Sequence, residues 1–116
     1  MNHAHLGARD LAAARSFYET YFGFRKKFDH GDGVFLEDRK GFLLAIDPVE
    51  SPPAFPDWYH LGFCMDDAVA VKSLYARMKQ DGIPIAREIK AEEGEFASFY
   101  VLDPGGNKLE VSWHRE

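Results

Sequence analysis

The segment Ser98–Ser112, SFYVLDPGGNKLEVS, decides the fold because it contains two strand-like runs joined by a tight turn. The runs are FYVL and KLEVS, the second of which continues to Trp113, and the DPGG between them is strong turn chemistry. Side chains alternate along a strand, so Glu110 lies on the face opposite the apolar one. The segment therefore predicts a hairpin that presents one carboxylate away from the apolar layer. That apolar face consists of Leu109, Val111 and Trp113.

Length and composition limit what the chain can be. Its 116 residues, 46% of them hydrophobic, are enough for one domain or for two small motifs that share a core. With 19 acidic and 14 basic residues the formal charge is −5, which favours neither nucleic acid nor an anionic membrane as a partner. We found neither a signal-peptide pattern nor an apolar run of about 18 residues, so we expect a soluble cytoplasmic protein. The single cysteine, Cys64, is expected to be a small core residue.

The pattern of elements occurs twice along the chain. The first half predicts a strand at 3–9, a helix from Asp10 to about Phe22 and three further strands. The second half predicts a strand at 59–65, a helix that starts at Asp66 or Asp67 and runs to about Gln80, and again three strands. The remaining strands are expected at 24–29, 33–37, 41–47, 84–90, 95–102 and 108–113.

The two halves are related by a constant interval. Val71 follows Ala14 by 57 residues, and His60 follows His3 by the same interval, which indicates an internal repeat. The segment 48–56 contains four of the six prolines and is expected to be a connector. We therefore predict an α+β fold of two paired βαβββ modules, 1–47 and 57–116, that form a curved sheet around a cavity. The helix faces expected to pack on the sheets are Ala14, Phe17, Tyr18 and Tyr21, and Val71, Leu74, Tyr75 and Met78.

Alternation within the strands places three potential metal ligands on the helix-free faces. His3, His60 and Glu110 all lie opposite the apolar positions of their strands. Two imidazoles and one carboxylate form a set that suits a borderline divalent ion with open coordination positions, here Fe, Mn, Zn or Ni. His5 shares its face with His3 and remains an alternative first ligand, because His-Leu-Gly recurs at 60–62.

Three segments carry a resemblance to a known superfamily. HAHLGARDLAAARSFYETYFGF, WYHLGFCMDD and FYVLDPGGNKLEV resemble the signature segments of the vicinal oxygen chelate superfamily, which includes glyoxalase I, fosfomycin resistance proteins, extradiol dioxygenases and bleomycin resistance proteins. The resemblance covers essentially the whole chain. It implies paired βαβββ modules, and it implies His3, His60 and Glu110 as the metal ligands, in agreement with the residue pattern.

Further site residues follow from the resemblance and from their positions. Tyr100 lies ten residues before Glu110, as a tyrosine does in extradiol dioxygenases, and is the candidate catalytic residue. Lys90 and Ser98 resemble residues of fosfomycin-type transferases and are candidate substrate contacts. Trp58 directly precedes the ligand strand and is a candidate cavity wall. The full set of candidate substrate-binding residues is Trp58, Lys90, Ser98 and His5.

Two functions from different classes follow. The first is a metal-dependent enzyme, of lyase, thiol-transferase or dioxygenase type, in which the ion binds two neighbouring oxygens of a small substrate. The second is a metal-free protein that sequesters a ligand, as bleomycin resistance proteins do. The resemblance also implies a homodimer, and the sequence leaves open whether the modules pair within one chain or between two chains.

Overall fold

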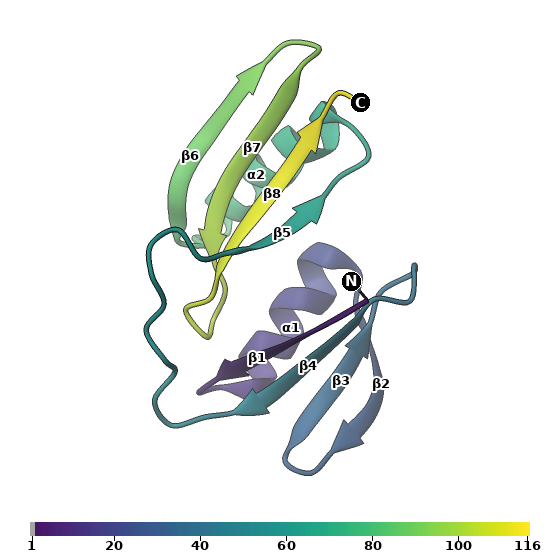
Figure 1. Cartoon of the computed structure of the whole chain (residues 1–116), viewed down its shortest axis with the longest axis vertical. Helices are drawn as coiled ribbons and strands as arrows, with labels where there is room; N and C mark the ends of the chain where they lie inside the picture. The colour runs from purple at the N-terminus through teal and green to yellow at the C-terminus, as the bar shows by residue number, and fades with distance from the viewer. Residues whose placement is uncertain (1) are drawn as a thin grey trace. The chain divides into compact units, whose positions relative to one another are not determined.

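The computed structural model describes residues 2–116, which form two compact units (Figure 1). The first unit comprises the described residues up to Ala54 and the turn 104–106, and the second comprises 55–103 and 107–116. Each contains one helix and four strands in the order strand, helix, strand, strand, strand. The predicted α+β class and the two βαβββ modules are therefore confirmed.

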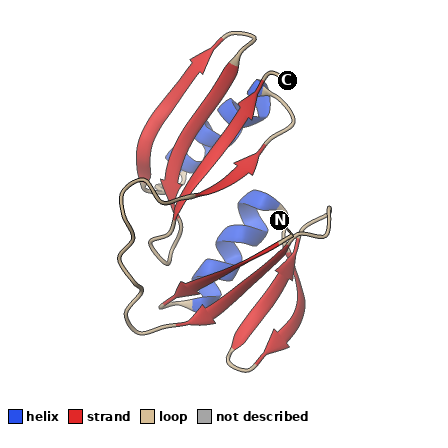
Figure 2. Ribbon diagram, in the orientation of Figure 1, coloured by secondary structure: helices blue, strands red, loops and turns tan. Residues whose placement is uncertain are grey.

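The first unit is a four-stranded sheet with one helix along one face (Figure 2). Its strand order is β1-β4-β3-β2, in which β1 runs parallel to β4 and the other neighbours are antiparallel. Strand β4 extends to Pro48, the position at which the sequence predicted the start of the connector. The elements are β1 (His3–Ala8), α1 (Leu11–Phe22), β2 (Arg25–His30), β3 (Gly33–Glu37) and β4 (Leu43–Pro48).

Helix α1 begins and ends where the sequence predicts. Asp10 caps its first turn by accepting a hydrogen bond of 3.0 Å from the backbone N–H of Ala13. Gly23 ends it in the left-handed region with φ +71°, a conformation that glycine adopts without a side-chain clash. Three of the four positions expected to face the sheet are buried, Ala14, Phe17 and Tyr18.

The second unit repeats the same topology. Its strand order is β5-β8-β7-β6, with β5 parallel to β8 and antiparallel pairing elsewhere. The hairpin predicted from Ser98–Ser112 is formed by β7 and β8. The elements are β5 (Leu61–Cys64), α2 (Ala68–Gln80), β6 (Ile85–Glu92), β7 (Phe96–Leu102) and β8 (Lys108–His114).

Helix α2 covers the apolar face of this second sheet. Asp67, rather than Asp66, is its N-cap and accepts a hydrogen bond of 2.7 Å from the N–H of Ala70. Apolar side chains from the helix and from β7 and β8 form the core of the unit. They are Val71, Leu74, Met78, Ala97, Phe99, Val101, Leu109 and Val111.

Two expectations about strand β5 are wrong. The strand starts at Leu61, so His60 immediately precedes the strand instead of lying inside it. Cys64 is exposed and is not a core residue. The reason is alternation: Leu61 and Phe63 are directed toward the helix-covered side, which places Gly62 and Cys64 on the opposite face. Neither helix within residues 2–116 is both long and apolar enough to cross a membrane.

Candidate metal and substrate site

The helix-free face of the second unit is organised around Glu110. In the sheet register Glu110 of β8 lies between Gly62 of β5 and Tyr100 of β7. A Cβ atom added to Gly62 would meet no heavy atom within 4 Å, so the space beside the carboxylate is open on that side. The glycine therefore leaves room above the sheet for the imidazole of His60.

One hydrogen bond orients the His60 ring. Its Nδ1 lies 3.0 Å from the backbone carbonyl oxygen of Trp58. A carbonyl only accepts, so Nδ1 carries the hydrogen and Nε2 is the nitrogen directed to the carboxylate. Nε2 lies 3.5 Å from Oε1 of Glu110, and the two side chains are only 31% and 22% exposed. A neutral His60 thus places a nitrogen lone pair against a carboxylate oxygen, and a cation would satisfy both.

Tyr100 packs against the His60–Glu110 pair. Its ring stacks on the His60 ring with centroids 5.0 Å apart and an interplanar angle of 30°. The Nζ of Lys108 lies 5.7 Å from the centre of the Tyr100 ring and also donates to the backbone carbonyl of Asp57. Lys108 therefore connects the tyrosine to the segment that precedes His60.

Arg87 of β6 is a site residue that sequence analysis did not identify. Its guanidinium lies 4.5 Å above the Tyr100 ring and donates a 2.5 Å hydrogen bond to Oγ of Ser98. Two register shifts in β6 bring it there. From Ile85 to Arg87 the strand advances two residues while β7 advances one, from Val101 to Tyr100, and from Arg87 to Lys90 it advances three while β7 advances two, to Ser98. Strict alternation would place Arg87 and Lys90 on opposite faces. The signal in the sequence that could have indicated Arg87 was a basic residue on the strand predicted to pair with the strand of Tyr100.

The other candidate substrate contacts are arranged less closely. Lys90 is exposed and sits beside Ser98 in the register. Trp58 contributes its carbonyl to His60 but leaves its side chain 75% exposed. The aromatic rings around it are also exposed, with Phe55 stacked on Tyr59 at 4.7 Å. The segment before His60 therefore presents an aromatic surface to solvent.

The helix-free face of the first unit contains a second histidine–carboxylate pair. His5 is exposed, and its Nε2 lies 2.5 Å from Oδ2 of Asp47. Asp47 belongs to the same strand as Ala45, the register partner of His5, and was not identified from the sequence. His3 is also exposed, and its Nδ1 lies 2.7 Å from Oδ1 of Asn2. His3 thus uses Nδ1 locally, as His60 does, whereas His5 uses Nε2.

Among residues 2–116, neither unit by itself brings together the ligands of a complete metal site. Within the described residues of each unit, no three His, Cys, Asp or Glu side chains come together as potential ligands of one ion. His60 and Glu110 are brought together in the second unit, and His3 belongs to the first. The set of His3, His60 and Glu110 therefore stays a prediction.

The chain thus consists of two βαβββ units, and one of them carries a His–Glu pair beside a tyrosine. This combination defines a class of small proteins built from a repeated βαβββ unit. The family model of the Glyoxalase/Bleomycin resistance protein/Dioxygenase superfamily matches residues 1–111. The chain belongs to this superfamily, as the sequence resemblance implied.

Individual relatives are similar over nearly the whole chain. The glutathione transferase FosA of Serratia marcescens is 30% identical over 114 residues, which cover 96% of this chain and 78% of that protein. The structure of a possible glyoxalase from Bacillus cereus has a TM-score of 0.80 and 29% identity, covering 96% of each chain. The lactoylglutathione lyase of Agrobacterium tumefaciens has a TM-score of 0.71 and 28% identity, covering 97% of this chain and 92% of the other.

Proposed function

We propose that the protein is a metal-dependent enzyme acting on a small anionic substrate that has two neighbouring oxygen atoms. His3, His60 and Glu110 would hold one divalent ion, which we expect to be Fe, Mn, Zn or Ni. The observation that carries the proposal is the 3.5 Å approach of His60 Nε2 to Glu110 Oε1, with Nδ1 already bonded to the Trp58 carbonyl.

The donor atoms fit such an ion. Ligand atoms about 2.0–2.2 Å from one ion lie roughly 3–3.5 Å apart, which matches the distance between His60 and Glu110. Metal-binding histidines commonly donate the hydrogen of their other nitrogen to a carbonyl or carboxylate, as His60 does to Trp58. The pair therefore has the chemistry of two ligands of a site that a third side chain completes.

His3 is a better third ligand than His5. Its Nδ1 is engaged with Asn2, so Nε2 is left for an ion in the same way as in His60. The Nε2 of His5 is instead held by Asp47 at 2.5 Å. We propose that His5 and Asp47 support the site or contact the substrate, and that the third ligand is His3 of the same chain or of a second copy in a homodimer.

The protein's own side chains indicate the charge of the substrate. When bound, the ion would act as a Lewis acid that stabilises negative charge on substrate oxygens. Arg87 and Lys108 flank Tyr100, and Lys90 is the register neighbour of Ser98. These cations would bind a carboxylate, phosphonate or phosphate group of the substrate, and the Tyr100 hydroxyl would donate a hydrogen bond to the reacting oxygen. Arg87, by bonding Ser98 Oγ, would fix that hydroxyl for the same anion.

The relatives favour thiol chemistry among the possible reactions. A glutathione transferase and a lactoylglutathione lyase are both about 30% identical to this chain. We therefore rank a thiol-transferase or lyase reaction ahead of a dioxygenase reaction. A metal-free binding protein is the second candidate, and the exposed Phe55, Trp58 and Tyr59 group favours it as a surface for an aromatic ligand.

Elemental analysis tests the proposal directly. Protein purified without a metal-chelating tag is expected to contain about one equivalent of Fe, Mn, Zn or Ni per chain. His60→Ala and Glu110→Ala are each expected to lose most of it, because half of the pair cannot hold the ion as tightly. Glu93→Ala, which removes an exposed carboxylate on the β6–β7 turn, serves as the matched control.

The outcomes separate the two candidates. Normal metal content in either ligand variant would refute the ligand set. Protein that contains no metal and takes up none on addition would instead favour the binding protein. Metal-loaded protein would then be assayed for glutathione addition to epoxides and for glutathione-dependent isomerisation, with catechol cleavage under O₂ tested if the metal is iron.

A further inference from the structure

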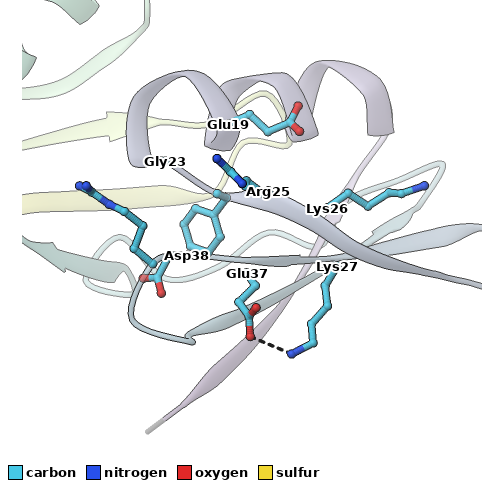
Figure 3. A pocket seen from close by; sticks show the side chains of 9 residues that line it. Glu19, Gly23, Arg25, Lys26, Lys27, Glu37 and Asp38 are labelled. Carbon is cyan, nitrogen blue, oxygen red and sulfur yellow. Dashed lines mark hydrogen bonds and ion pairs between the residues drawn. The ribbon is translucent and has the colours of Figure 1, made fainter.

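A depression on the first unit lies at the end of helix α1 and across the β2–β3 edge of the sheet (Figure 3). Its volume is about 770 Å³, within the range of sites for small molecules. None of the candidate site residues discussed above lies in its wall. The lining residues are Glu19, Gly23, Phe24, Arg25, Lys26, Lys27, Glu37, Asp38 and Arg39.

The backbone on one side of the depression is held in place where the helix ends. The N–H groups of Gly23 and Phe24 both donate to the carbonyl of Tyr18, in the pattern that closes a helix with a left-handed glycine. Phe24 is only 3% exposed, and its ring packs edge-on against Tyr18 at 5.9 Å. Arg25 follows directly, so a buried aromatic anchor fixes the backbone from which its side chain extends.

The backbone on the other side is fixed by Asp38. Its Oδ1 accepts hydrogen bonds of 2.9 Å from the N–H groups of both Lys40 and Phe42. Gly41 completes the turn at φ +86°. Arg39 lies within this turn, so the second arginine also extends from an ordered backbone.

The carboxylates of the wall are already satisfied. Glu19 pairs with Arg15 at 3.2 Å, and Glu37 pairs with Lys27 at 2.8 Å, an ion pair drawn in Figure 3. The Oδ1 of Asp38 accepts hydrogen bonds from two backbone N–H groups of the turn. Among residues 2–116, no carboxylate lies within ion-pair distance of the guanidinium of Arg25 or Arg39. Four basic and three acidic side chains line the depression, and Arg25 and Arg39 are the basic ones that form no ion pair within residues 2–116.

We propose that this depression binds a tetrahedral oxyanion, with Arg25 and Arg39 as its principal contacts. A guanidinium offers two parallel N–H donors that match the oxygens of a phosphoryl or sulfuryl group. The volume of about 770 Å³ exceeds what a free phosphate needs, so the chemical class is a phosphorylated or sulfated small molecule. Lys26, partly engaged with Asp29 at 3.1 Å, lies in the same wall as a further cation.

Titration of the ¹⁵N-labelled full-length protein tests the site. Inorganic phosphate and phenyl phosphate would be added separately in a chelator-containing buffer while amide resonances are followed. We expect saturable shifts at Gly23, Arg25, Lys40 and Gly41. Saturation by phosphate alone would assign a free anion, and saturation by the ester only would assign a phosphorylated molecule.

Two variants and one control make the result specific. Arg25→Gln and Arg39→Gln should each weaken binding about tenfold, since each removes one charge-assisted contact. Lys72→Gln makes the same charge change on an exposed position of α2 and should leave binding unchanged. The proposal is overturned if neither anion shifts these amides saturably, or if Lys72→Gln weakens binding as much as the arginine variants. Shifts confined to Tyr100 and Glu110 would also overturn it, because the anion would then occupy the other site.

Discussion

At the scale of single residues, the site depends on which atoms are already engaged. The Nδ1 of His60 donates to a carbonyl, which leaves Nε2 for Glu110, and the guanidinium of Arg87 over Tyr100 donates to Ser98 and to the carbonyl of Glu88. The sequence shows which side chains are present but not how their polar atoms are shared. Glu110 could be identified from alternation, and alternation along the predicted strand 41–47 also places Asp47 opposite Leu44 and Ile46, whereas the position of Arg87 depends on register shifts that alternation does not show.

Arg87→Gln is expected to weaken substrate binding more than it slows turnover. The variant loses the charge above Tyr100 but keeps a side chain that can hydrogen-bond Ser98. In the assay that detects activity, KM should rise about tenfold with a smaller change in kcat, because an ionic contact present before reaction is lost. Metal content should stay at the wild-type level. An unchanged KM would exclude Arg87 from substrate binding.

Gly33→Ala is expected to destabilise the first unit. A Cβ at Gly33 would lie 2.0 Å from Oδ1 of Asp47 and 2.6 Å from the carbonyl oxygen of Ile46, so strand β4 would have to move. The free energy of unfolding should fall by about 1–3 kcal/mol in urea denaturation. The matched control is Gly62→Ala, whose Cβ meets nothing within 4 Å and should change stability by less than about 0.5 kcal/mol. Equal effects of the two variants would contradict this account.

At the scale of elements, helix ends and strand faces were predictable from sequence, and strand ends and bulges were not. Asp10 and Gly23 mark helix α1 because capping is local chemistry between residues close in sequence. The two register shifts in β6 arise from its pairing with β7, so no pattern within β6 shows them. Cys64 was assigned to the core from its residue type, although the alternation of β5 already placed it on the helix-free face.

The cap of helix α2 gives a clean test of this local chemistry. Asp67→Ala removes the acceptor for the N–H of Ala70 and should lower the free energy of unfolding by about 1 kcal/mol. Asp66→Ala changes the neighbouring exposed carboxylate and should have a smaller effect. Thermal and urea unfolding of both variants would be compared at one pH. A larger loss for Asp66→Ala would show that the cap is wrongly assigned.

At the scale of the whole molecule, the repeat of 57 residues predicted the two units. It did not predict which potential metal-binding side chains each unit carries. The helix-free face of the first unit has Ala45 beside His5 in the register, whereas the second has Glu110 beside Gly62. The two halves have therefore kept their topology while their polar residues have diverged. Family membership supports the fold, and the proposed reaction would depend on these differing positions.

The expected homodimer can be tested without knowing the substrate. Light scattering coupled to size-exclusion chromatography should give about twice the chain mass of 13.2 kDa. The expectation comes from the family resemblance, and the proposed ligand His3 belongs to a different unit from His60 and Glu110, so either the same chain or a second copy would supply it. If the protein is a monomer that nevertheless binds one equivalent of metal, the units of a single chain must supply the whole ligand set.

The bond from His60 to Trp58 has an evolutionary consequence. The acceptor is a main-chain carbonyl, which every amino acid possesses, so no substitution at position 58 can delete it. Trp58 as a whole residue is 75% exposed, and its indole takes no part in that bond. Position 58 is therefore free to drift or to be redesigned for new ligands while the neighbouring imidazole keeps its orientation. Changes in ligand recognition at position 58 and preservation of the candidate metal site at position 60 can thus be inherited separately, although the two positions are close in the chain.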